Sequence, residues 1–133
     1  IRDNIDDILV KIIQFTHIRH RIILDIIKNC RVAGFVPKRV DVEDFAKVIS
    51  VALAEHQRSK KLSLCDSHTI SFSFGGRLSI EPEADIAAQK LFAQNFERYI
   101  CLQKQRLNEN AANNKTACSL LRHKMRSAKM AAR

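Results

Sequence analysis

Apolar residues recur at steps of three and four along the first thirty positions, the spacing of one face of an α-helix. A second apolar row flanks the first, so the apolar arc is wider than contact with one partner helix requires. We therefore predict a helix over residues 3–31 that packs against several neighbours, other copies of the chain among them. The first row is Ile5, Ile8, Ile12, Phe15, Ile22 and Ile26, and the second is Leu9, Ile13, Ile23 and Ile27.

Residues with special backbone preferences mark both ends of this helix. Asp3 or Asn4 can cap its N-terminus, because a short polar side chain accepts hydrogen bonds from the first free N–H groups. Gly34 is the only glycine in the first seventy residues and suits a left-handed position after the last turn. Pro37 prevents the helix from resuming at once. The N-terminal helical segment is thus expected to occupy residues 1–34.

The middle of the chain, residues 35–82, changes from one periodicity to another. Phe45, Val48, Ile49 and Leu53 share one face of a second, short helix predicted over residues 43–56. After a basic loop, the alternation switches to a period of two around Gly75-Gly76, which predicts a β-hairpin. The hairpin must lie on a helix or on a neighbouring subunit, since an isolated hairpin is only marginally stable in water.

The register of this hairpin follows from its apolar residues. A two-residue Gly-Gly turn would place the apolar residues of the two strands on opposite faces. A three-residue Gly75–Arg77 loop pairs Phe74 with Leu78 and Phe72 with Ile80, all on one face, and this is the register that we predict.

Residues 83–133 contain neither glycine nor proline and are predicted to be helical. The Asn-rich stretch 108–114 is poor helix material, because asparagine competes for its own backbone. A break around residues 101–108 and one uninterrupted helix are both compatible with the pattern. The prediction is a mainly α fold in a single domain, residues 1–133.

The composition shows a basic chain and argues against some classes of protein. The chain has 133 residues, is 46% hydrophobic and carries a formal net charge of +9, so it is globular and favours acidic partners. No run approaches the ~18 apolar residues of a membrane span. Acidic residues stand where a secretory signal would be basic, so no cleaved signal peptide is expected. Cys30, Cys65, Cys101 and Cys118 are widely spaced and are expected to be free thiols packed as small apolar groups.

No catalytic or cofactor motif is recognisable. The acidic residues stand mostly at predicted helix starts, where capping explains them, and no nucleophile motif or phosphate-binding glycine loop occurs. His17 with His20, and Cys65 with His68, each supply one pair of possible metal ligands without a second pair at short spacing. We therefore expect no enzyme activity, no cofactor and no metal.

Clusters of basic residues leave nucleic-acid binding open as an alternative function. Few aromatic residues are interleaved with these charges, so stacking on bases is poorly provided for. Cations at a helix C-terminus also have a purely structural explanation, since they complement the helix dipole. The candidate nucleic-acid contacts are Arg58, Lys60, Lys61, Arg122, Lys124 and Arg126.

Two segments resemble the FlgB-type rod proteins of the bacterial flagellar basal body. In that family an Arg-rich helix runs into an Asn-Ile-Ala-Asn-Ala-x-Thr-Pro-Gly-Tyr motif, and here Asn29, Gly34 and Phe35 match its second Asn, its Gly and its aromatic residue. Ile26 stands at the first Asn, and Val32-Ala33 stands at Thr-Pro. The closing helix of the family is matched by Leu107, Asn110, Ala111, Ala117, Leu120, Leu121, Lys124 and Met125.

The resemblance implies a structural subunit. In this family the N- and C-terminal helices pack together, and subunits associate with one another and with other rod proteins in the periplasmic basal body. Export proceeds through the flagellar type III apparatus without cleavage of a signal peptide. The resemblance also implies that Asn29 and Gly34 shape the exit from the first helix, Asn29 through side-chain capping and Gly34 through a permissive backbone.

Overall fold

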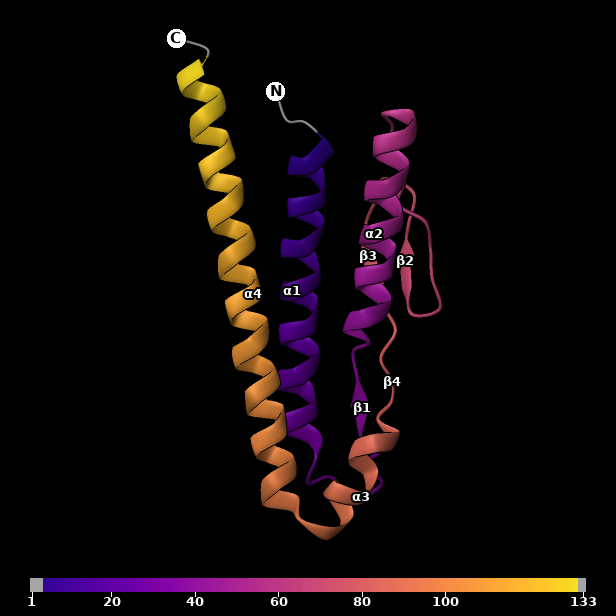
Figure 1. Ribbon diagram of the computed structural model, residues 1–133. Helices are drawn as coiled ribbons and strands as arrows, with labels where there is room; N and C mark the ends of the chain where they lie inside the picture. The colour runs from indigo at the N-terminus through magenta and orange to yellow at the C-terminus, as the bar shows by residue number, and fades with distance from the viewer. Residues whose placement is uncertain (1–3, 132–133) are drawn as a thin grey trace.

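The computed structural model describes residues 4–131 and is mainly helical, as predicted (Figure 1). The long N- and C-terminal helices pack together, and a small antiparallel hairpin accompanies the central helix. In chain order the elements are α1 Asn4–Asn29, β1 Lys38–Arg39, α2 Val42–Ser59, β2 Ile70–Phe72, β3 Leu78–Ile80, β4 Glu83–Ala84, α3 Ile86–Gln94 and α4 Phe96–Ala131.

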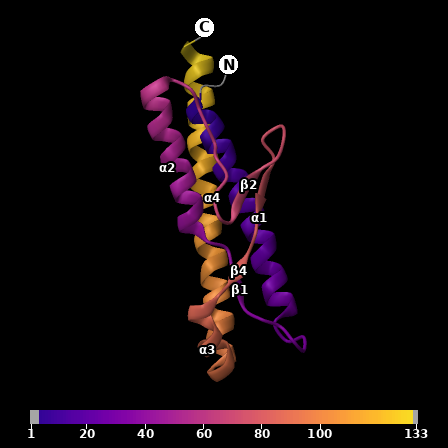
Figure 2. The same ribbon diagram turned by 90° about the vertical axis from the view of Figure 1, so that its right-hand side faces the viewer.

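Helix α1 is the centre of the molecule. It lies between α4 and α2, and α4 runs antiparallel to it, so that the first turns of α1 and the last turns of α4 share one end (Figure 1). The side view places α2 and the β2–β3 hairpin on opposite sides of the molecule, with the hairpin against α1 (Figure 2). Three different neighbours therefore contact one helix, which accounts for much of its broad apolar arc.

The ends of the first two helices differ from the predicted boundaries. Helix α1 ends at Asn29 rather than at residue 31 or at Gly34, and Gly34 lies in the following turn with φ +84°. Helix α2 extends to Ser59, beyond the predicted end at residue 56, and Lys60 closes it in the left-handed conformation. Arg58 therefore lies in the last turn of a helix, not in a loop. Asp3, one of the two predicted caps, lies outside the described residues.

The predicted hairpin register is wrong by two positions. Phe72 pairs with Leu78, and Ile70 pairs with Ile80. The loop still has three residues, 74–76, but Phe74 stands at its tip, fully exposed, instead of pairing across the sheet. Both Gly75 and Gly76 have positive φ, which glycine adopts at little cost. Since the predicted and observed registers differ by two positions, the apolar residues remain on one face.

The C-terminal region is interrupted at Asn95, outside the predicted window of 101–108. The Asn95 side chain accepts a hydrogen bond from the Arg98 N–H at 3.1 Å and so caps the start of α4. Helix α4 then continues without a break through the Asn-rich stretch 108–114. At the start of the region Glu83–Ala84 is a strand, because it pairs with β1.

The buried apolar side chains form two separate clusters. The first fills the space between α1, α2 and the hairpin, and within it the rings of Phe15 and Phe45 stack with centroids 4.0 Å apart. The second joins the exit of α1 to α3 and the start of α4. The buried members of the first cluster are Phe15, Val40, Phe45, Val48, Ile70 and Leu78, and those of the second are Ile26, Cys30, Ala88 and Tyr99.

Candidate assembly interface

An apolar groove of about 380 Å³ runs along the part of α1 that is flanked by both α2 and α4. Helix α1 supplies the floor, α2 one wall and α4 the other. Most of its side chains are aliphatic or aromatic, a composition suited to an apolar partner. The lining consists of Leu9, Ile12, Phe15, Thr16, Val42, Phe45, Ala46, Ile49, Asn113, Thr116, Ala117 and Leu120.

The predicted apolar row of α1 is largely covered by the chain itself. Ile8, Phe15 and Ile26 are buried, and Ile12 and Ile22 are half-buried; Ile5 is 37% exposed. Most of this row therefore needs no cover from other copies of the chain. Besides Ile5 at the start of the helix, the stretch around Ile12 remains partly accessible, and there the row forms the groove floor.

The C-terminal residues that carry the family resemblance divide between the two faces of α4. Asn110 is buried, and Leu107 and Leu121 are half-buried. Leu120 is 50% exposed on the groove wall, and Met125 is 48% exposed further along the helix. The structure thus brings Leu120 together with the apolar row of α1 in one surface, and leaves Met125 outside it.

A row of polar side chains between α1 and α4, which we term the polar seam, was missed by the sequence reasoning. The Asn110 amide donates to the Thr16 carbonyl oxygen at 2.7 Å, and the Asn114 amide donates to the Thr16 hydroxyl at 2.8 Å. Buried Arg19 pairs with Glu109 at 3.2 Å. These bonds explain why asparagines tolerate a helix interior here: their amides bond across the interface rather than to their own backbone.

One signal in the sequence could have revealed this seam. Gln103, Asn110 and Ala117 are buried at intervals of seven residues along α4, and Lys124, the next in the series, lies 3.7 Å from Asp6 of α1. A seven-residue interval keeps side chains on one helix face whether they are polar or apolar. Apolar periodicity alone does not include the polar members of this series.

The segment that leaves α1 is held by local hydrogen bonds and by ring packing. The Asn29 amide donates to the Asp25 carbonyl at 2.8 Å, so this side chain bonds back to the helix four residues earlier. Backbone bonds from Val32 to Asn29 and from Phe35 to Val32 then turn the chain through Gly34. The Phe35 ring lies 5.4 Å from that of Phe92, which fixes this turn to α3.

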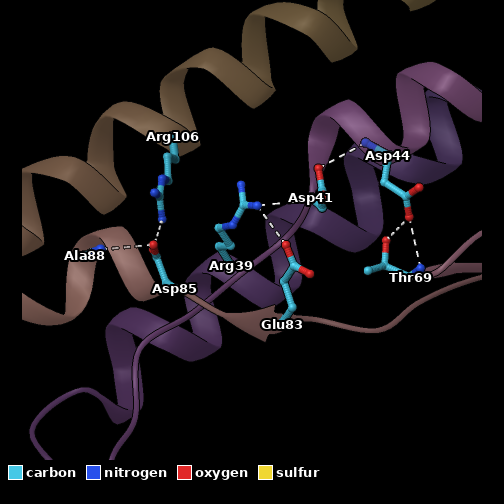
Figure 3. Close-up of polar contacts among 8 residues, drawn as sticks. All are labelled: Arg39, Asp41, Asp44, Thr69, Glu83, Asp85, Ala88 and Arg106. Carbon is cyan, nitrogen blue, oxygen red and sulfur yellow. Dashed lines mark hydrogen bonds and ion pairs between the residues drawn. The ribbon is translucent and has the colours of Figure 1, made fainter.

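A carboxylate fixes the long connection between α2 and the hairpin. Asp44 accepts hydrogen bonds from the Thr69 hydroxyl and from the Thr69 N–H at 2.9 Å (Figure 3). It also accepts one from the Ser67 hydroxyl at 2.8 Å. The bond from the Thr69 side chain, followed by the one from Ser67, holds the pKa of Asp44 below its usual range. In the second apolar cluster, burial and the charge of Asp85 raise the pKa of Tyr99 to about 12, so this side chain is a neutral core phenol.

The basic residues considered for nucleic-acid binding gather at one end of the molecule. The last turn of α2 and the last turns of α4 both point to the end where α1 begins (Figure 1). Arg58, Lys60, Lys61, Arg122 and Arg126 are exposed, and Lys124 is half-buried. Part of this charge is matched, since Arg58 lies 2.6 Å from Glu55.

The remaining chemistry-bearing residues stay dispersed. All four cysteines are free thiols, but Cys65 and Cys101 are exposed, so the expectation that all four are packed as apolar groups is wrong for these two. Within residues 4–131 no group of three or more His, Cys, Asp or Glu side chains is placed to hold a metal ion. No helix in the same range combines the length and apolar character that a membrane crossing requires.

Comparison with family models, with curated proteins and with solved structures finds no match to this chain. Its function is therefore inferred from its own residues and geometry.

Proposed function

We propose that the chain is a structural subunit of a flagellar basal-body rod, assembling through helix packing with itself and with other rod proteins. Three features support this proposal: the resemblance around Asn29–Phe35, the resemblance along residues 107–125, and the packing of α1 against α4. The observation that carries it is the apolar groove beside Ile12, because an accessible apolar surface on a folded protein is typical of an interaction site.

The groove suits an apolar helix face or side chain from another subunit. Amphipathic helices bind such grooves through a few anchoring side chains, each contributing roughly 1.5–3 kcal/mol when fully buried. If the anchor lies on a different face of the same chain, each contact leaves a free groove and a free anchor, so subunits add without closing into a dimer. A rod requires this kind of open association.

The packing around the groove keeps its walls in place. Hydrogen bonds from Asn110 and Asn114 to Thr16 fix α4 along α1, and the Phe15–Phe45 stack fixes α2. A preformed surface loses less entropy when a partner binds than a mobile one does. The proposed location is the periplasmic basal body, reached by flagellar export without signal cleavage.

Leu120→Asp tests the proposal at an exposed groove position. The substitution places a charge on the groove wall without opening the core, and we expect the self-association constant to fall at least about tenfold. Sedimentation velocity across a concentration series, with electron microscopy of the assembled material, measures this. Ser119→Asp is the matched control, since it adds the same charge at the adjacent exposed position outside the groove lining.

Two results would contradict the assembly proposal. One is a wild-type chain that remains monomeric up to about 1 mM, with and without other rod subunits. The other is equal association by the Leu120→Asp and Ser119→Asp variants. Circular dichroism on both variants establishes that each retains the helical fold.

Nucleic-acid binding is the second candidate, favoured by the gathering of two basic clusters at one end of the molecule. Phosphate contacts release counterions, so the affinity for duplex DNA or for RNA should fall steeply with salt. Replacing Arg122, Lys124 and Arg126 together with glutamine should abolish retardation in a gel at low salt. Absence of retardation for the wild-type chain would exclude this candidate.

A further inference from the structure

A second, smaller cavity of about 150 Å³ lies between α1, α4 and the connection from β1 to α2. It shares Val42 with the lining of the groove, and its lining is mainly polar. Three arginines from three different elements reach it: Arg19 from α1, Arg39 from β1 and Arg106 from α4. The lining consists of Arg19, Ile23, Ile26, Arg39, Val40, Val42, Glu43, Gln103 and Arg106.

Gln103 is the residue that makes this cavity unusual. It is 0% exposed, and within residues 4–131 neither its amide nitrogen nor its amide oxygen has a hydrogen-bond partner. Buried polar groups are nearly always satisfied, so a fully buried amide lining a cavity indicates that the cavity holds its partner. That partner must both accept a hydrogen bond from Nε2 and donate one to Oε1.

The three guanidinium groups are oriented by carboxylates that do not line the cavity. Arg106 Nη1 donates to Asp85 at 2.8 Å, and Arg39 Nη2 donates to Glu83 at 2.7 Å (Figure 3). These bonds, like that of Arg19 Nη1 to Glu109, use one terminal nitrogen of a group that carries five N–H donors. The remaining N–H groups of the three arginines are available to hydrogen-bond one shared acceptor in the cavity.

The charge of Arg19 is incompletely compensated. Its side chain is almost wholly buried, whereas that of its partner Glu109 is 59% exposed. Burial lowers the pKa of Arg19, and the neighbouring positive charge of Arg106 adds to that effect. The only acid on the cavity lining is Glu43, which is exposed. Arg19 and Arg106 thus place two like charges on one cavity, although each also pairs with a carboxylate outside it, and two such charges favour an anion between them.

We propose that this cavity binds a single hydrogen phosphate ion. Its unprotonated oxygens accept hydrogen bonds from the arginines and from Gln103 Nε2, and its P–OH group donates to Gln103 Oε1. Guanidinium groups match phosphate oxygens in geometry as well as charge. The volume is below the roughly 300 Å³ at which drug-sized ligand sites begin, which favours the free ion over a nucleotide. A bound ion would join α1, α4 and the β1–α2 connection.

Thermal unfolding of the whole chain in a phosphate-free buffer, with inorganic phosphate added at constant ionic strength and pH 7, tests this site. Binding to the folded state alone raises the midpoint along a saturating curve, by roughly 5–10 °C at a phosphate concentration one hundred times Kd. Sodium sulfate should give a clearly smaller rise, because sulfate carries no proton to donate to Gln103 Oε1. O-phosphoserine should also give a smaller rise, because its organic group does not fit.

Gln103→Leu removes both amide groups and keeps a side chain of similar size, so it should abolish the phosphate response. Gln105→Leu is the matched control: it makes the same substitution two residues away at an exposed position and should respond as the wild type does. Arg39→Gln, at a partly exposed cavity residue, should weaken phosphate binding about tenfold with little effect on the fold. The Arg39→Gln variant therefore tests the phosphate site even if the Gln103→Leu variant fails to fold.

Several outcomes would overturn the assignment. They are no phosphate-dependent rise in the wild type, an equal rise with sulfate, an equal rise with O-phosphoserine, and an unchanged phosphate response in Gln103→Leu or Arg39→Gln. Isothermal titration of the wild type with phosphate gives the stoichiometry, for which one ion per chain is expected. None of these measurements depends on self-association, so this site and the assembly proposal can fail separately.

Discussion

The two sides of α1 are built from different chemistry. On the side of α2 and the hairpin, the contact is apolar and centred on the stacked rings of Phe15 and Phe45. On the side of α4 the contact includes Thr16, Arg19 and Asn110, which hydrogen-bond or pair across the interface. One helix of 26 residues thus combines two kinds of packing at successive positions of its surface.

The difference separates stability from specificity. Burial of apolar area is the larger source of folding free energy, but it is not directional and tolerates sliding of one surface over another. Buried hydrogen bonds contribute less net energy, yet they penalise every other alignment because a shifted donor or acceptor loses its partner. A single buried asparagine is known to fix the register of paired helices. We infer that the hairpin side of α1 stabilises the fold and that the polar seam sets the alignment of α4.

The largest effect is expected from Phe15→Ala on the apolar side. Removing a buried ring from a packed core leaves a cavity, and the free energy of unfolding should fall by about 3–5 kcal/mol. Urea denaturation followed by circular dichroism measures the loss. Phe74→Ala deletes the same ring at the exposed hairpin tip and should change the free energy of unfolding by less than about 0.5 kcal/mol.

A smaller effect is expected from Asn110→Ala in the polar seam. The variant loses the bond to the Thr16 carbonyl, and the free energy of unfolding should fall by about 1–3 kcal/mol. Asn108→Ala, an exposed asparagine two residues earlier on the same helix, is the control and should be nearly neutral. Equal losses in the two variants would contradict a specific role for the seam.

A second substitution at Asn110 tests whether this residue sets the alignment of α4 or only stabilises the fold. Asn110→Leu replaces the buried amide by an apolar side chain of similar size, which should restore much of the lost free energy. If the seam sets the alignment of α4, this variant should show exchange broadening of α4 amide signals in NMR spectra despite its stability. Sharp, single signals along α4 would show that the apolar contacts suffice for alignment.

The smallest effect is expected at acid pH, from Asp44. Because hydrogen bonds lower its pKa in the folded state, the stabilisation is present above its ordinary value of about 3.9 and is lost as the pH falls through the lower folded-state value. Asp44→Asn should therefore lower stability at pH 7 and flatten its dependence on pH below about 4. Glu43→Gln changes the adjacent exposed acid and should leave that acid dependence as in the wild type.

The periodicity of the sequence was sufficient to predict the fold class, the two outer helical regions, the central helix and the presence of a hairpin, but not the β1–β4 ladder or the break at Asn95. Three- and four-residue steps around Phe15 and Val48 are local, so they predicted α1 and α2 to within a few residues. The predicted hairpin register considered only turn length and side-chain face, whereas in the structure the Lys11 ammonium of α1 also donates to the Gly76 carbonyl in the hairpin loop. No rule of turn length contains that bond.

The polar features were the least predictable. The partners Asn110 and Thr16 are 94 positions apart in the chain, and nothing local links them. Asn95 and Asn110 are the same residue type, yet one caps a helix and the other lies in its interior. The difference is whether a partner helix offers a carbonyl oxygen in reach, and that is decided by tertiary packing.

The two-residue ladder between β1 and β4 has a consequence for how such a chain can vary. The polypeptide leaves at Lys38–Arg39 and returns beside the same point at Glu83–Ala84, and the pair is reinforced by Arg39 and Glu83 at 2.7 Å. The segment from residue 40 to residue 82 therefore begins and ends at the same point of the fold, and the helices before and after it hold that point in place. We therefore expect that a chain in which this segment is replaced by one of different length keeps both outer helices, provided that the replacement covers Phe15.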